Sequence, residues 1–343
     1  MKATRKGLWL LALTCISFFA FGISNVSAEK YGDYLYYTEE NGEITITKCN
    51  DSAQTVEIPS VIDEKPVTSI GKKAFFWCDN LTSVTIPNTV RDIGESAFYS
   101  CTQLADITFP ESVTNIGNHA FDQCSALESV IIPGNVLSIG EYAFTSCDAL
   151  TSATVQDGVK SIGLFAFDGC GSLKNITLPD SLTEIADQAF YGTAYYNDEQ
   201  NWENDVLYIG NHLIKAENSV SGEYVVKPGT KAIGDCAFYY CSGLTRITLP
   251  DSTTSIGSRS FGGCSGLVGM TIPKNVTYIG AYAFQDCVDS TGIEVAPDNT
   301  AYLSEDGILY NKEKTEILYY PIQKTESSFV LPDSVTRIAD AAF

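Results

Sequence analysis

The stretch IPNTVRDIGESAFYSC, residues 86–101, returns 23 residues later as FPESVTNIGNHAFDQC, residues 109–124. The proline, the Ile-Gly pair, the phenylalanine and the cysteine keep their places, while most residues between them change. A fixed internal period is the sequence signature of stacked repeat units, so this stretch decides the fold.

The same phase extends over most of the chain. An Ala-Phe pair, replaced once by Ser260-Phe261, recurs in two runs and stands again at the end of the sequence. A cysteine follows three residues later in eight of these units. The phenylalanines are Phe75, Phe98, Phe121, Phe144, Phe167, Phe190, Phe238, Phe261, Phe284 and Phe343. The cysteines are Cys78, Cys101, Cys124, Cys147, Cys170, Cys241, Cys264 and Cys287.

Each unit reads as a strand followed by a curved return. Val84 and Ile86 alternate with polar residues, which predicts a short strand, and Pro87 ends it because proline cannot donate a ladder hydrogen bond. Gly94 permits a turn, and the Ala-Phe pair fills the interior on the return. One unit cannot bury its apolar face, but stacked units can. The sequence therefore predicts a mostly β repeat solenoid with one parallel sheet.

Two gaps break the period, and a similar segment precedes the first unit. Each contains a Leu-Tyr pair, a polar turn and a second apolar run, as around Gly210-Asn211, which predicts a β-hairpin. The acidic stretches Glu39–Gly42 and Ser304–Gly307 lack the alternating ligands of a calcium loop and fit turns. The predicted organisation is a signal peptide at 1–28, an N-terminal capping hairpin at 29–57, repeats at 58–190, a hairpin-containing insertion at 191–229, repeats at 230–287, a second such insertion at 288–329 and the start of a further repeat at 330–343.

The first 28 residues have the pattern of a secretory signal, with a basic start, the apolar run Leu8–Phe21 and small residues before position 29. We therefore expect a secreted or cell-surface location. This segment carries three of the 21 basic residues and none of the 42 acidic ones, which leaves a net charge of −24 on the rest. Such a surface repels phosphate backbones and anionic lipids, which argues against nucleic-acid binding and against membrane insertion after cleavage.

The full unit, L-x-x-V-x-I-P-x-x-V-x-x-I-G-x-x-A-F-x-x-C at residues 81–101, resembles the repeat of BspA-type leucine-rich repeat surface proteins. The resemblance covers nearly all of residues 31–343 and implies a leucine-rich repeat solenoid with hairpin interruptions. It also implies adhesion, since BspA-type proteins include adhesins that engage host matrix proteins or other cells. The sequence departs from the commoner leucine-rich pattern after the strand, where Thr89, Ser112, Asn135, Gly158 and Ser181 replace an asparagine ladder.

The regular cysteines admit several roles. Strands about 4.8 Å apart would bring consecutive cysteines within disulfide reach. However, the first five cysteines share one environment, so their Cβ vectors should run parallel, and an odd number cannot pair completely. A metal site needs ligands that converge, whereas a column spreads them along a line. The pattern favours buried free thiols that act as small hydrophobes. A disulfide stays open for Cys49 and Cys236, which lie outside the column.

The sequence contains no pattern typical of a catalytic site. G-x-S-x-G, H-E-x-x-H and P-loop motifs are missing. His119 occupies a variable slot that we expect to be solvated, and His212 lies in a predicted hairpin turn, so neither suggests a triad. We expect no enzyme activity, cofactor or metal from this chain. Because the last unit stops inside the motif, we expect the native protein to continue beyond Phe343.

Candidate contact residues lie on the predicted strand face and in the first insertion. A threonine column on that face fits cross-strand packing, while the positions beside it vary. Aromatic residues in the polar insertion suit contact anchors, and they fit a cover over the core equally well. The candidates are Asp106, Glu128, Lys174, Asn175 and Arg246 on the face and Tyr195, Tyr196 and Trp202 in the insertion.

Three functions fit these observations. The first is a secreted or surface protein that binds an extracellular protein or glycoprotein, because repeat stacks present long rigid surfaces. The second is the targeting array of a secreted hydrolase whose catalytic domain lies beyond Phe343. The third is a structural surface layer. The resemblance favours the first.

Overall fold

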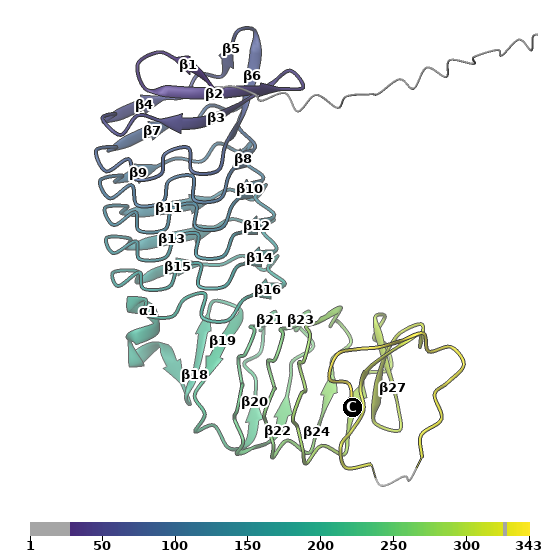
Figure 1. Cartoon of the computed structure of the whole chain (residues 1–343). Coiled ribbons are helices and arrows are strands. Elements are labelled where there is room, and N and C mark those ends of the chain that lie inside the picture. Colours follow the sequence, from purple (N-terminus) through teal and green to yellow (C-terminus); the bar gives the residue numbers. More distant parts are fainter. Residues whose placement is uncertain (1–27, 325–327) are drawn as a thin grey trace, which may run out of the picture.

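The computed structural model describes residues 28–324 and 328–343. The predicted signal peptide therefore lies outside the described residues except for Ala28. Figure 1 shows two stacks of coils that meet at an angle, with the short helix α1 near their junction. We name the coils of residues 55–190 the first array and those of residues 222–295 the second array. The repeat solenoid predicted from the sequence is confirmed.

A hairpin covers the N-terminal end of the first array. β2 (Leu35–Glu40) and β3 (Glu43–Cys49) are antiparallel, and Asn41 and Gly42 make the turn with φ values of 54° and 81°. Strand β3 then pairs in parallel with β6 (Lys65–Ile70), which starts the stack. Two short strands, β1 (Glu29–Tyr31) and β5 (Val61–Ile62), flank β2 and β6 respectively.

Each coil of the first array contributes two strands, which corrects the expectation of one parallel sheet. The expected strand before the proline lies on an outer face, where the strands form two three-stranded sheets, and a two-residue strand before the glycine belongs to one inner sheet. Two residues are too few for alternation to show in the sequence. The outer strands are β4 (Thr55–Glu57), β7 (Ser83–Thr85), β9 (Asp106–Ile107), β11 (Ser129–Ile132), β13 (Ser152–Val155) and β15 (Asn175–Thr177). The inner strands after β6 are β8 (Asp92–Ile93), β10 (Asn115–Ile116), β12 (Ser138–Ile139), β14 (Ser161–Ile162) and β16 (Glu184–Ile185).

The second array repeats this arrangement and ends in a four-stranded sheet. Its outer strands are β20 (Gly222–Val225), β22 (Leu244–Thr248), β24 (Gly269–Ile272) and β26 (Gly292–Val295). Its inner strands are β21 (Ala232–Ile233), β23 (Ser255–Ile256) and β25 (Tyr278–Ile279). The final sheet contains β27 (Tyr302–Glu305), β28 (Ile308–Asn311), β29 (Glu316–Tyr319) and β30 (Arg337–Ile338).

The phenylalanines of the repeat stack in columns through both cores. Neighbouring ring centroids lie 4.7–5.5 Å apart from Phe75 to Phe190 and 5.5–5.9 Å apart from Phe238 to Phe284. The planes of Phe121 and Phe144 differ by only 4°. Residues in the same phase therefore meet their own copies in the next coil, as the period predicts.

The backbone around each phenylalanine joins consecutive coils. The N–H of Phe75 donates to the carbonyl of Ala97 in the next coil at 2.7 Å, whereas the N–H of Ala74 bonds within its own coil. This alternation places Lys73 and Trp77 at positive φ, 61° and 59°. The same alternation recurs in later coils, so the arc is a hydrogen-bonded ladder although it contains no regular strand.

The column cysteines are buried free thiols, as the sequence predicts. The Sγ of Cys124 lies 3.2 Å from the carbonyl oxygen of Phe98, and the Sγ of Cys147 lies 3.3 Å from that of Phe121, so each thiol donates to the preceding coil. All ten described cysteines are free, including Cys49 and Cys236. Burial raises the pKa of the Cys287 thiol to about 12, which keeps this thiol protonated at neutral pH.

We expect the native protein to react slowly with a thiol reagent at neutral pH and the unfolded, unreduced protein to react at most of its cysteines. Reaction requires thiolate and access, and burial removes both. Cys236, the one partly exposed cysteine among the described residues, should react first in the native state. Counting modified sites by mass spectrometry with and without urea tests this. Fewer than half of the thiols free in urea would show that disulfides hold the chain.

Polar side chains replace the asparagine ladder after the outer strand. The hydroxyl of Ser112 donates to the carbonyl of Val90 at 2.7 Å, and the hydroxyl of Ser181 donates to that of Val159 at 2.9 Å. The amide of Asn135 donates to the carbonyl of Glu111 at 2.7 Å. Each bond reaches the preceding coil, so different residue types satisfy backbone carbonyls there.

The insertion between the arrays forms a wedge. Its hairpin, β18 (Val206–Ile209) and β19 (His212–Ala216), buries Leu207 against the core of the first array and Leu213 against the core of the second. On the inner side the arrays touch directly, since the N–H of Asp235 donates to the carbonyl of Ile185 at 2.9 Å. On the outer side the insertion separates β15 from β20. This asymmetry accounts for the bend in Figure 1.

The hairpin turn is anchored to the last coil of the first array, so His212 is fully buried rather than exposed in a turn. Its Nε2 donates to the carbonyl of Pro179 at 2.9 Å, and its Nδ1 has no partner among the described residues. Asp180 and Lys231, themselves 3.8 Å apart, are the charged groups nearest the ring. Burial lowers the pKa of His212 because it disfavours the charged imidazolium.

We expect His212 to destabilise the fold in mild acid. The pKa of His212 is lower in the folded state than in the unfolded state. Its contribution to the free energy of unfolding is therefore complete above the unfolded pKa of about 6.5 and is lost as the pH falls toward the folded pKa. Asp235 acts oppositely, since burial raises its pKa to about 6 and protonation then favours the folded state. The difference between wild type and His212→Gln in urea unfolding at pH 7 and pH 5 isolates the histidine. An unchanged pH profile in His212→Gln would contradict the assignment.

Candidate binding surface

The candidates on the first outer sheet are exposed but do not converge. Asp106 lies on β9, Glu128 precedes β11, Lys174 directly precedes β15, and Asn175 is the first residue of β15. They occupy different coils of one face, an arrangement suited to an extended contact rather than to chemistry. In the part of the chain that the structure describes, no group of acidic, histidine or cysteine side chains could hold a metal ion.

The threonine column follows the centre of this face and is interrupted by an apolar residue that the sequence analysis did not single out. Thr108, directly after β9, and Thr177 on β15 are exposed, while Ile131 on β11 occupies the same column with 59% of its surface exposed. The sequence contained a signal for this contact point, because Ile131 replaces the threonine that recurs at this position of the repeat. It adds an apolar contact point to the face.

The three aromatic candidates form one half-buried cluster on the insertion. Besides its hairpin, the insertion contains α1 (Ala194–Asn197), η1 (Glu199–Asn201) and β17 (Trp202–Glu203). Tyr195 joins α1 to the last coil of the first array, because its N–H donates to the carbonyl of Leu173 at 2.8 Å. Tyr196 and Trp202 meet edge to face with centroids 5.2 Å apart. The Trp202 indole N–H donates to the carbonyl of Tyr196 at 2.8 Å. These rings therefore cover the core and also remain accessible from outside.

A cavity of about 440 Å³ opens beside this cluster. Tyr196 and Trp202 line it together with Glu199, Asp205 and Glu217 and two asparagines. Burial, and next the negative charge of Glu217, raises the pKa of Tyr196 to about 12. No local sequence pattern indicates this cavity, because its carboxylates come from three separate segments.

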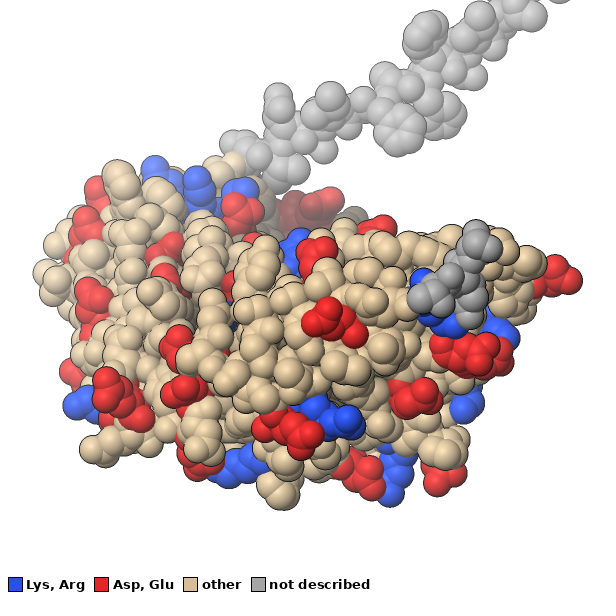
Figure 2. All heavy atoms as spheres, turned by 90° about the horizontal axis from the view of Figure 1, so that it is seen from below, with Lys and Arg blue, Asp and Glu red and all other residues tan. Residues whose placement is uncertain are grey.

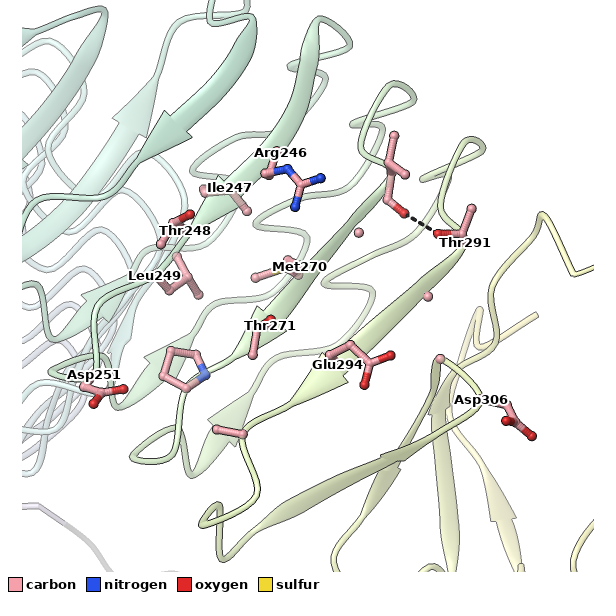
Figure 3. A pocket seen from close by; sticks show the side chains of 16 residues that line it. Arg246, Ile247, Thr248, Leu249, Asp251, Met270, Thr271, Thr291, Glu294 and Asp306 are labelled. Carbon is pink, nitrogen blue, oxygen red and sulfur yellow. Dashed lines mark hydrogen bonds between the residues drawn. The ribbon is translucent and has the colours of Figure 1, made fainter.

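A shallow groove of about 540 Å³ crosses the second outer sheet. Figure 3 shows Arg246 on β22 and Glu294 on β26 beside it, with Asp306 on the turn at its far end. Arg246 already faces a partner, since its Nε lies 3.5 Å from a carboxylate oxygen of Glu223. The turn packs closely on β26: a Cβ on Gly292 would lie 2.6 Å from the Cα of Gly307. The hairpin thus closes one end of the groove.

The insertion fills the space between the outer face of the first array and the outer face of the second array. Lys174 and Asn175 adjoin α1 on one side, and β20 carries Glu223 beside Arg246 on the other. We name this region the outer corner: Lys174, residues 194–205 and 217–225, and the adjoining strands β15 and β22. Figure 2, a view from below, shows acidic and basic side chains interspersed, with no broad basic field on that face.

Sequence comparison identifies the repeat. The family model of the BspA-type leucine-rich repeat region, present in six copies, matches residues 68–197, 137–221 and 223–343. The chain belongs to the BspA-type leucine-rich repeat family. No curated protein matches it in sequence. The BspA-type motif accounts for the phenylalanine and cysteine columns described above.

Solved structures of leucine-rich repeat proteins from bacteria are similar to this chain. A leucine-rich repeat protein from Bacteroides ovatus is 26% identical, and the match covers 79% of this chain and 95% of that one with a TM-score of 0.45. A leucine-rich cell surface protein from Faecalibacterium prausnitzii is also 26% identical, with 91% and 66% covered and a TM-score of 0.33. The T. pallidum protein TpLRR is 25% identical, with 70% and 90% covered and a TM-score of 0.42.

Replacing Trp202 by alanine should lower the free energy of unfolding by about 1 to 3 kcal/mol, because the change removes core contacts and the bond to Tyr196. The structure therefore argues against the interpretation that Trp202 serves only as a contact anchor and contributes nothing to stability. Trp77→Ala, at a position 61% exposed, is the matched control and should stay within about 0.5 kcal/mol. Equal effects of the two changes in urea unfolding would contradict the packing assigned to Trp202.

Proposed function

We propose that this chain is a secreted or cell-surface protein that binds an extracellular protein or glycoprotein through the outer corner and performs no catalysis. The observation that carries the proposal is the insertion itself. It presents half-buried aromatic rings and free carboxylates between two outer sheets, and packing against both cores holds it in place. Rigid aromatic contact groups bind with little loss of conformational entropy, which is why they dominate protein interfaces.

Three further features support an extracellular site of action. The first 28 residues have the pattern of a signal peptide, and the BspA-type repeat resembles that of surface adhesins. The column cysteines, which an oxidising compartment could otherwise attack, are buried, and all of them except Cys78 donate to a backbone carbonyl. The acidic surface favours solubility of a secreted solenoid, because like charges repel one another.

The test compares two charge reversals of the same kind. Lys174→Glu changes the outer corner, whereas Lys160→Glu changes an exposed lysine next to β14 on the inner side. Binding of each variant to a panel of immobilised extracellular matrix glycoproteins is measured by surface plasmon resonance. We expect Lys174→Glu to weaken binding at least tenfold and Lys160→Glu to leave it within twofold. Equal binding by both variants, or a loss in Lys160→Glu alone, would contradict recognition at the outer corner.

A further inference from the structure

The cavity beside α1 combines two aromatic walls with an acidic rim. Tyr196 and Trp202 stand at 87° to each other, so one ring presents its face where the other presents its edge. Glu199, Asp205 and Glu217 surround the opening, and no lysine or arginine lines it. Within residues 28–324 and 328–343 none of these three carboxylates forms an ion pair. The cavity therefore offers negative charge and π surface with no internal cation to satisfy them.

The walls are fixed before any ligand arrives. Thr193 caps α1 by accepting the Tyr196 N–H on its hydroxyl at 3.1 Å. Trp202 is held by its bond to Tyr196, and Tyr195 donates its hydroxyl to the carbonyl of Tyr208 at 3.0 Å. On the rim, Asp205 accepts a hydrogen bond from the hydroxyl of Ser219 at 2.8 Å. A ligand that enters meets rings already in position, which lowers the entropic cost of binding.

We propose that this cavity binds a lysine or arginine side chain of the partner protein, an inference that rests on the proposed function. A cation near an aromatic face is attracted to the ring quadrupole, and carboxylates at the rim add charge-assisted hydrogen bonds. The long aliphatic stem of either side chain packs on the rings while its charged end reaches the carboxylates. The net charge of −24 outside the leader draws basic partners to the surface.

The exposed position of the carboxylates favours a side chain on a protein over a free small cation. Exposed ion pairs contribute little because water screens them, so a lone cation at this open cavity binds weakly. A partner that also contacts the neighbouring outer sheets supplies the remaining affinity. The cavity then acts as a specificity pocket inside a larger contact, because it accepts a basic residue and rejects an acidic one.

Trp202 itself can report the binding. The sequence contains three tryptophans, so the full chain with Trp9→Phe and Trp77→Phe has Trp202 as its sole tryptophan. Its fluorescence is titrated with the blocked peptides acetyl-Gly-Lys-Gly-amide and acetyl-Gly-Arg-Gly-amide, with the norleucine peptide as a neutral match of similar length, and with tetramethylammonium. We expect saturable changes with the lysine and arginine peptides, with dissociation constants on the order of 1 mM, and none with norleucine.

Substitutions at the rim decide whether the carboxylates act. Glu199→Gln with Glu217→Gln should raise the dissociation constant at least tenfold. The matched control, Glu57→Gln with Glu111→Gln, makes the same change in net charge on exposed residues of the first array and should leave the constant within twofold. Equal binding of the norleucine peptide, equal effects of the two double variants, or no saturable change would overturn the proposal. Tighter binding of tetramethylammonium than of the peptides would also overturn it, by assigning the cavity to free cations.

These outcomes are separable from those of the proposed function. If Lys174→Glu weakens binding to a matrix glycoprotein while the basic peptides leave Trp202 unchanged, recognition at the outer corner stands and the basic side chain is excluded. If the peptides bind in the cavity while both lysine reversals leave glycoprotein binding unchanged, the cavity takes a basic side chain and the outer-corner contact is wrong.

Discussion

Replacing Phe121 by alanine should lower the free energy of unfolding by about 3 to 5 kcal/mol. Its ring is fully buried between those of Phe98 and Phe144, at centroid distances of 5.0 and 5.2 Å. Truncation removes transfer energy, leaves a cavity and breaks two stacking contacts at once. Because backbone hydrogen bonds hold the coils in place on both sides, the column has little freedom to collapse into the gap.

Urea unfolding followed by circular dichroism measures this effect. The matched control is Thr108→Ala on the exposed face of the same coil, which should change stability by no more than about 0.5 kcal/mol. Phe121→Leu keeps most of the volume and should recover a large part of the loss. If Phe121→Ala were as stable as Thr108→Ala, the phenylalanine column would not be what holds the coils together.

Leu207→Ala and Leu213→Ala should each cost about 2 to 5 kcal/mol, but in different parts of the chain. Both side chains are fully buried on one hairpin, with Leu207 in the core of the first array and Leu213 in that of the second. Repeat arrays depend on interactions between neighbouring coils, so a defect at the end of one array weakens that array first.

Hydrogen exchange of peptides from each array separates the two effects. Leu207→Ala should speed exchange around β14 and β16, and Leu213→Ala should speed exchange around β21 and β23. Tyr36, half-buried in the capping hairpin, offers a control in Tyr36→Ala, which should affect neither junction. Identical exchange profiles for the two leucine variants would mean that the hairpin does not divide its faces between two cores.

The sequence was most informative where residues repeat. The phase of Phe98 and Cys101 predicted the ring column and the free thiols, because in a stack each residue meets its own copy one period later. The short strand before Pro87 was predicted because apolar and polar residues alternate along it, as they do along any half-buried strand. Inner strands such as β8, with two residues each, escaped notice since alternation needs a longer run.

The non-repeating parts required the structure. The sequence predicted that His212 lies in a hairpin turn. It is nevertheless buried, because the hairpin is inserted between two cores and is not exposed to solvent. Tyr196 and Trp202 were identified as aromatic residues of a polar insertion, but only the fold shows that they both cover the core and line a cavity. Glu217 approaches them from a different strand end, a contact that no local pattern encodes.

The central claim is that recognition uses the outer corner, and a hydrogen exchange footprint tests it most directly. The chain is bound to a matrix glycoprotein from the binding panel, and exchange is compared with that of the free chain. We expect slower exchange in residues 194–205, 217–225 and 244–248, with no change along the inner strands β8 to β16. Protection confined to the inner strands, with the outer corner exchanging as in the free chain, would contradict it.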